Sequence, residues 1–97
     1  MSSTSPRIER GAALLDELRP GWDKTIDVDR LDLGNCERCI LGQLYGGYDQ
    51  ALQMLDGEVA KRPATFGFNT YGPERFWTLT ERWRTYIERR RKGRAAA

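Results

Sequence analysis

Apolar residues near the start of the chain recur at helical spacing. A first amphipathic helix is predicted over residues 6–18, with its apolar face formed by Ile8, Ala12, Leu15 and Leu18. Ser5 is a natural N-cap, and Pro6 follows at the first helical position, where a proline is well tolerated. Pro20 and Gly21 then end the pattern.

The longest periodic pattern lies at the C-terminal end of the chain. Pro73 stands near its start, and apolar or aromatic residues then recur at steps of three and four, namely Phe76, Leu79, Trp83, Tyr86 and Ile87. We therefore predict a helix over residues 73–92 whose buried face is rich in aromatic rings.

The middle of the chain predicts two shorter helices. Asn35 suits the N-cap of a helix over residues 35–46, which Gly46 and Gly47 would end. A second helix is predicted over residues 48–56. The inner face of the first of these two helices would contain Cys36, Cys39, Ile40 and Leu44.

The remaining segments have no helical periodicity. Residues 22–34 alternate charged and apolar side chains, but no second strand is evident to pair with them, so an irregular segment with one helical turn is expected. Its apolar residues would lie on the core: Trp22, Ile26, Leu31 and Leu33. Residues 58–72 are predicted to form a long irregular connection held by Phe66 and Phe68.

Together these elements predict an all-α fold, a compact bundle of three longer helices and one short helix. A single helical domain is expected over residues 6–92, between a disordered N-terminus at 1–5 and a flexible tail at 93–97. The predicted core consists of Leu15, Leu18, Ile40, Leu44, Phe76, Leu79, Trp83 and Ile87.

Composition narrows the range of functions. Of 97 residues 39% are apolar, yet no apolar run approaches the roughly 20 residues of a membrane helix, and residues 1–6 lack the features of a signal peptide. A soluble, cytoplasmic protein is therefore expected. Histidine is absent, which removes the commonest general base and the commonest metal ligand. We therefore expect no enzymatic activity, no cofactor and no metal.

The two cysteines, Cys36 and Cys39, stand three residues apart. Two thiols without a histidine cannot complete a four-ligand zinc site within one chain, although a site shared by two chains and a redox-active pair both stay open. A reducing cytoplasm keeps most thiols free. The favoured interpretation is a pair of reduced, metal-free thiols buried on the inner face of a helix.

Positive charge is concentrated at the C-terminal end. Residues 74–97 contain eight basic and three acidic side chains, a net charge of +5, whereas residues 1–73 carry −3. This asymmetry suits a salt-sensitive nucleic-acid site formed by Arg82, Arg84, Arg89, Arg90, Arg91, Lys92 and Arg94. Residues 42–55 also have the glycine and leucine spacing of a helix-turn-helix, but the recognition helix would bring Asp49 and Asp56 towards the phosphates.

Aromatic residues are numerous for a chain too short to bury them all readily. Exposed aromatic side chains are typical anchors of protein interfaces. The candidate protein-binding residues are Trp22, Tyr45, Tyr48 and Trp77. The function expected first is therefore that of a small regulatory or accessory protein that binds another protein, with nucleic-acid binding through the basic C-terminal helix as the alternative.

Several short motifs occur in a combination that resembles a group of small proteins encoded by actinobacteria and their bacteriophages. The motifs are Leu31-Asp32-Leu33, residues 39–46 (CILGQLYG), Phe66-Gly67-Phe68, and Leu79-Thr80 followed by Trp83 and Ile87. The similarity covers most of residues 11–88. The resemblance implies a phage-related origin, a location in the host cytoplasm and a host or phage protein as partner. It implies no activity, cofactor or catalytic residue.

Overall fold

The computed structural model describes residues 5–55, 57–70 and 72–96, and all regular structure in these ranges is helical. The predicted all-α fold is thereby confirmed. In chain order the elements are α1 (Pro6–Leu18), α2 (Trp22–Thr25), α3 (Ile40–Tyr45), α4 (Tyr48–Met54), α5 (Gly57–Lys61), the 3-10 helix η1 (Pro63–Phe66) and α6 (Phe76–Ala96). None of the helices described here has the length and apolar character needed to cross a membrane.

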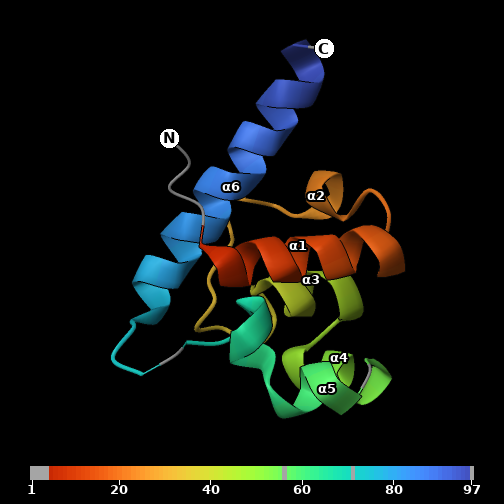
Figure 1. Ribbon diagram of the computed structural model, residues 1–97, viewed down its shortest axis with the longest axis vertical. Helices are drawn as coiled ribbons and strands as arrows, with labels where there is room; N and C mark the ends of the chain where they lie inside the picture. The colour runs from red at the N-terminus through yellow and green to blue at the C-terminus, as the bar shows by residue number, and fades with distance from the viewer. Residues whose placement is uncertain (1–4, 56, 71, 97) are drawn as a thin grey trace.

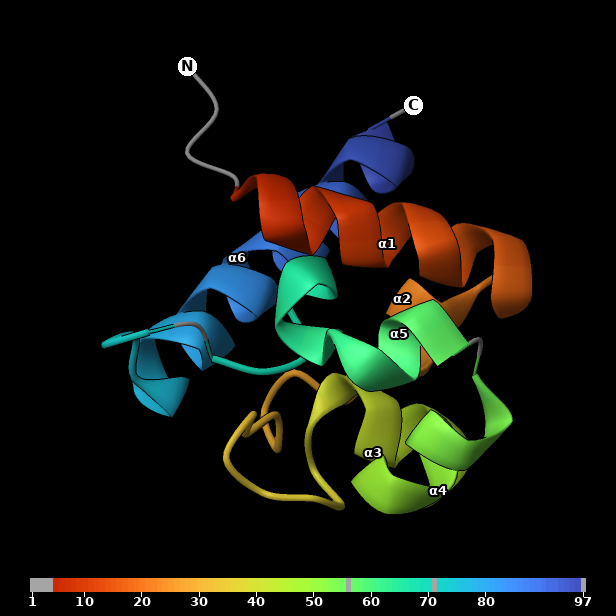
Figure 2. The ribbon, with the colours of Figure 1, turned by 60° about the horizontal axis from the view of Figure 1, so that its bottom comes forward.

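Helix α6 forms one side of the molecule, and its C-terminal half extends past the other helices (Figure 1). The short helix η1 packs against α1, and α5 packs against both η1 and α4. These two short elements therefore lie between α1 and the α3–α4 pair (Figure 2). The result is a stack of helices with α6 along its flank.

The predicted bounds of the first helix are confirmed, whereas those of the last differ. The Ser5 side chain accepts a hydrogen bond from the Arg7 backbone N–H at 3.3 Å, as expected of an N-cap. Helix α6 begins three residues later than predicted and continues to Ala96, so residues 93–96 are helical instead of forming a separate tail. Of the residues 1–5 predicted to be disordered, Ser5 is placed as the N-cap of α1, and residues 1–4 lie outside the described residues.

The helix predicted over residues 35–46 begins only at α3, so the predicted start is wrong. Asn35 does act as a cap, but for a separate turn: its side-chain oxygen accepts hydrogen bonds from the backbone of Glu37 (2.9 Å) and Arg38 (3.0 Å). Asparagine favours such turns as strongly as helix N-caps, because the same side-chain oxygen serves both. The turn precedes the helix and is not its first part.

Cys39 caps α3 in place of Asn35. Its backbone is extended (ψ 175°), and its sulfur accepts a hydrogen bond from the Gly42 N–H at 3.2 Å. A Cβ on Gly42 would lie 2.2 Å from the carbonyl oxygen of Cys36. Only glycine therefore allows the turn before α3 to pack directly against the helix.

Two other predictions of local structure need correction. Helix α4 ends at Met54, two residues earlier than predicted. The connection over residues 58–72 is not irregular throughout, because it contains most of α5 and all of η1. The predicted role of its aromatic residues is confirmed, since Phe68 is buried and Phe66 packs half-buried against the core.

Trp83 lies at the centre of the core. Its ring is met edge-on by Trp22 at 5.9 Å between centroids and is stacked with Phe68 at 6.0 Å. The indole N–H donates a 2.6 Å hydrogen bond to the carbonyl oxygen of Gly67, so the one polar atom of the buried ring is satisfied. One residue of α6 thus joins α2 and the segment after η1.

Most predicted core residues are buried: Leu15, Ile40, Leu44, Leu79, Trp83 and Ile87. Leu18 and Phe76 are corrections, at 46% and 41% exposed. Leu18 is the last residue of α1 and lies roughly 60° around the helix from Leu15. Phe76 is the first residue of α6, where the helix begins at the edge of the core close to Gly34. The expected burial of the apolar residues in 22–34 is confirmed for Trp22, Ile26, Leu31 and Leu33.

Replacing Gly11 with alanine is expected to destabilise the fold by about 2 kcal/mol, the range found for overpacked cores. A Cβ at Gly11 would lie 2.1 Å from the Phe66 carbonyl oxygen and 3.2 Å from the Trp83 ring. The free energy of unfolding in urea measures the effect. Gly93→Ala is the matched control in α6, where no atom lies within 4 Å, and it should stabilise by up to about 1 kcal/mol because alanine is the better helix former. Equal stability of the two variants would contradict the close packing of α1.

Candidate functional site

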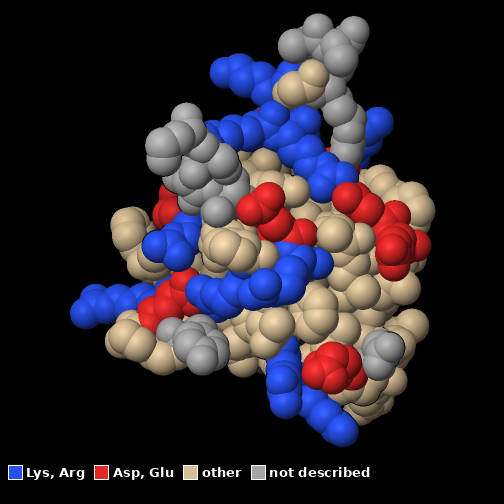
Figure 3. Space-filling model, in the orientation of Figure 1, with Lys and Arg blue, Asp and Glu red and all other residues tan. Residues whose placement is uncertain are grey.

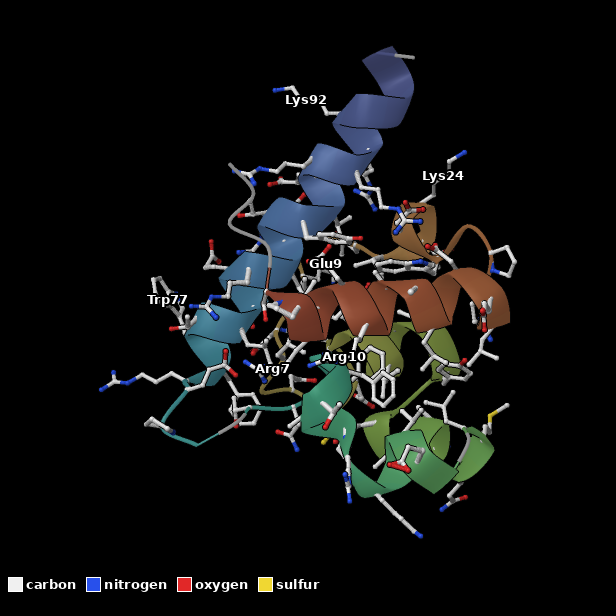
Figure 4. The ribbon with its side chains drawn as sticks, viewed as in Figure 1. Arg7, Glu9, Arg10, Lys24, Trp77 and Lys92 are labelled. Atoms are coloured by element: carbon white, nitrogen blue, oxygen red, sulfur yellow. The ribbon has the colours of Figure 1, made fainter. Side chains whose placement is uncertain are left out.

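Trp77 is the most exposed of the large apolar side chains described, at 73% of its surface. It lies in the first turn of α6 and points away from the other helices (Figure 4). Buried Leu79 follows two positions later, which places the two side chains roughly 200° apart around the helix. The same periodicity that buries Leu79 therefore exposes Trp77.

Two open hollows lie on either side of Trp77. One, of about 340 Å³, lies between α6 and the start of α1, where Ile8 and Tyr86 supply apolar surface. The other, of about 610 Å³, lies between α6 and the segment before α3, where Leu31 is flanked by charged residues. We call Trp77 together with these two hollows the Trp77 surface.

Arginines surround the Trp77 surface. Arg30 and Arg38 line the larger hollow, and neither forms an ion pair within the described residues. Arg82 and Arg89 line the smaller hollow, and Arg82 is half-exposed and lies 3.6 Å from a carboxylate oxygen of Glu74. Acidic side chains also line these hollows (Asp29, Asp32 and Glu81), but arginines are in the majority. An exposed indole with arginines on both sides is an arrangement that suits a partner carrying both apolar and acidic groups.

Trp22 is not an exposed anchor, so its prediction as a protein-binding residue is wrong. Only 1% of its surface is accessible. Its indole N–H donates to the Asp16 carboxylate at 2.9 Å, and the Arg90 guanidinium lies over the ring, 5.4 Å from its centroid. Trp22 is therefore a core residue beneath α6, as its role in the irregular segment 22–34 requires.

The two predicted tyrosines are half-buried and do not border the Trp77 surface. Tyr45 packs against the core and lies beneath the guanidinium of Arg19, 4.9 Å from its centroid. The hydroxyl of Tyr48 accepts a hydrogen bond from the Asn69 side chain at 3.3 Å. The four predicted aromatic residues therefore do not form one surface, and Trp77 is the one that is freely accessible.

Three of the predicted phosphate-binding residues are held by the protein itself. Arg84 donates to the backbone oxygens of Val28 (2.9 Å) and Leu31 (3.3 Å) and pairs with Glu81. Arg91 donates to the backbone oxygens of Asp23 (2.7 Å) and Ile26. These arginines hold the irregular segment 22–34 against α6. Because that segment is not paired with a strand, its carbonyl oxygens need other hydrogen-bond donors, and the arginines supply them.

Arg90 pairs with a buried carboxylate. Its Nε lies 2.8 Å from a carboxylate oxygen of Asp23, whose side chain is 1% exposed, and its guanidinium also pairs with Asp16. Arg82, Arg89 and Lys92 are exposed, and the side chain of Arg94 lies outside the description. Lysine and arginine side chains gather around the C-terminal half of α6 (Figure 3), but much of this charge is engaged in holding the fold.

The two cysteines occupy different environments, which corrects the prediction that both are buried on one helix face. Cys39 is 1% exposed, whereas Cys36 lies exposed in the preceding turn. Burial raises the pKa of the Cys39 thiol, and the charge of Cys36 raises it further. Among the described residues, no three histidine, cysteine, aspartate or glutamate side chains lie together as a metal site.

No family model, curated protein or solved structure matches the chain. The resemblance to phage and actinobacterial proteins therefore stays a prediction, and function is argued from the site.

Replacing Arg91 with glutamine should destabilise the protein by about 2 kcal/mol, because two backbone oxygens lose a charged donor. Lys92→Gln removes the same charge from the next, exposed residue and should change stability by less than about 0.5 kcal/mol. Urea denaturation of both variants compares them directly. If the two cost the same, Arg91 is a surface charge free to meet phosphate, and the structural assignment fails.

Proposed function

We propose that the chain is a small, non-catalytic protein-binding module whose contact surface is the Trp77 surface. The observation that carries the proposal is the exposure of Trp77, 73% accessible on a well-formed helix with a hollow on each side. Exposing so large an apolar side chain to water is unfavourable, and burying it against a partner recovers that free energy. Tryptophan is also the residue type that most often dominates binding energy at interfaces.

The partner is expected to be a protein with an apolar cleft for the indole and acidic groups around the cleft. Arg30 and Arg38 on one side of Trp77, and Arg82 and Arg89 on the other, would face those acidic groups. Charges at the rim of an interface act mainly on the rate of association and on specificity. By the sequence resemblance, this partner is a host or phage protein.

Nucleic-acid binding through the C-terminal half of α6 is the weaker candidate. Arg84, Arg90 and Arg91 are already bonded within the fold. Trp77, the exposed ring on which a base could stack, lies fifteen residues before Lys92, roughly 22 Å along the helix. Trp77 and the exposed Lys92 therefore lie far apart along α6, as the labelled side chains in Figure 4 show.

Replacing Trp77 with alanine should weaken partner binding by about 30-fold, which corresponds to about 2 kcal/mol. Unfolding in urea should be unchanged, since the side chain makes few contacts within the chain. Met54→Ala is the matched control, because Met54 is similarly exposed, at 70%, but lies on α4. The partner is captured from an actinobacterial lysate by the wild-type protein, identified by mass spectrometry, purified and titrated against each variant.

Two results would contradict the proposal. A partner that binds the Trp77→Ala and Met54→Ala variants equally well would show that binding uses another surface. Retention of nucleic acid instead of protein, with an affinity that falls steeply as salt is raised, would favour the basic end of α6.

A further inference from the structure

A small cavity brings the two thiols together with a phenol and an amide. The cavity is about 100 Å³ in volume. Cys36 and Cys39 line it with Tyr48 and Asn69, and Phe68 and Phe76 contribute apolar wall. It is separate from the hollows beside Trp77, and the inference drawn from it does not rest on the proposed function.

The backbone holds Cys36 and Cys39 within one turn. The N–H groups of Arg38 and Cys39 both donate to the carbonyl oxygen of Asn35, at 3.2 Å and 3.0 Å, which closes a helix-like turn. Two residues three apart in such a turn lie on the same side of it. The turn is fixed from outside as well, because the Cys36 carbonyl oxygen accepts the Tyr48 backbone N–H at 2.9 Å.

The two thiols and the Tyr48 side chain line the same small cavity. The charge of Cys36 contributes to the raised pKa of Cys39, after the larger effect of burial. Burial also raises the pKa of the Tyr48 phenol, and the charges of both cysteines add to that effect. These electrostatic effects agree with the shared cavity, so the two thiols and the phenol form one cluster.

The two thiols differ in solvent accessibility, and this difference gives them different roles. Cys36 is exposed, and an incoming molecule reaches it from solvent. Cys39 is 1% exposed and receives the Gly42 N–H at 3.2 Å, a contact that stabilises a thiolate on this sulfur. An exposed thiol next to a shielded one is the arrangement of an attacking and a resolving cysteine.

We propose that Cys36 and Cys39 are a thiol–disulfide exchange pair whose substrates are low-molecular-weight disulfides. In the first step the Cys36 thiolate attacks one sulfur of the disulfide, which forms a mixed disulfide and releases one small thiolate. In the second step Cys39 loses its proton to solvent and attacks the Cys36 sulfur, which closes the protein disulfide and releases the second small thiolate. Each released thiolate takes up a proton, so two protein thiols become one disulfide and one small disulfide becomes two thiols.

Glutathione disulfide is the probe for the test. The reduced protein is incubated with an excess, quenched by alkylation and measured by intact mass. The wild-type chain should lose two hydrogens and carry neither glutathione nor alkyl label. Cys39→Ser should retain one glutathione on Cys36, because no second thiol can displace it, and Cys36→Ser should stay unmodified while it is folded.

Other products would overturn the proposal. A wild-type chain that keeps glutathione on Cys36 while Cys39 is alkylated after unfolding would make Cys36 a solitary exposed thiol. Disulfide-linked dimers would place the reaction between chains, and a failure to react would remove the exchange activity altogether.

A second measurement requires no variant and therefore does not depend on whether Cys39→Ser folds. Phenylarsine oxide condenses with two neighbouring thiols, forming two sulfur–arsenic bonds and one water. The native wild-type protein should bind one arsenic per chain, and an added small dithiol should release it whereas a monothiol at the same concentration should not. An arsenical that binds only after unfolding would show that Cys39 does not reach a reagent held on Cys36 in the native protein, contrary to the proposal.

Discussion

The packing around Trp83 determines where the other elements lie. The ring is 0% exposed and is in contact with Trp22, Phe68 and Tyr86. The ring also limits which residues α1 can carry, because position 11 has no room for a side chain between the Phe66 backbone and the indole. Its N–H bond to Gly67 fixes the rotation of the ring. A single side chain of α6 thus sets the approach of α1, α2 and the segment after η1.

Around this centre, charged side chains satisfy backbone groups that apolar packing leaves without hydrogen bonds. The segment 22–34 has buried apolar side chains but no regular backbone pairing, so its carbonyl groups need donors. Arg84 and Arg91 supply them from α6, and Arg90 neutralises the buried carboxylate of Asp23. The basic character of the C-terminal region is therefore in part a structural requirement. Removing one member of a buried pair such as Arg90–Asp23 leaves an uncompensated charge, which is strongly destabilising.

Sequence periodicity was sufficient for the helices whose signals are local. The cap at Ser5 and the apolar stripes of α1 and α6 depend on neighbouring residues, and they are found where the pattern places them except at the helix ends, where Leu18 and Phe76 are exposed. The start of α3 could not be predicted in this way, because Asn35 suits a turn and a helix equally, and the choice depends on packing at Gly42. Arg84 and Arg91 carry no mark in the sequence that distinguishes them from surface arginines.

Among the candidate site residues, the exposure of Trp77 could have been predicted from its position around the helix, whereas the burial of Trp22 could not. Trp77 lies opposite Leu79 on a helix that the sequence predicts well, so its exposure follows from the pattern. Trp22 lies in a segment without strong periodicity, and its burial follows from α6 covering it. The exposure of Cys36 could not be predicted from the sequence for a similar reason, because it follows from the unexpected turn before α3.

The first turn of α6 borders both proposed sites. Phe76 forms part of the wall of the thiol cavity, whereas Trp77 lines the two hollows. The position of this turn is set by Thr80, whose hydroxyl accepts the Leu33 N–H at 2.9 Å and donates to the Phe76 carbonyl oxygen at 2.8 Å. Leu33 lies in the segment that leads to Cys36. Through these two hydrogen bonds, the position of that segment is linked to the position of the first turn of α6. The Trp77 surface and the thiol cavity therefore both depend on the position of the first turn of α6.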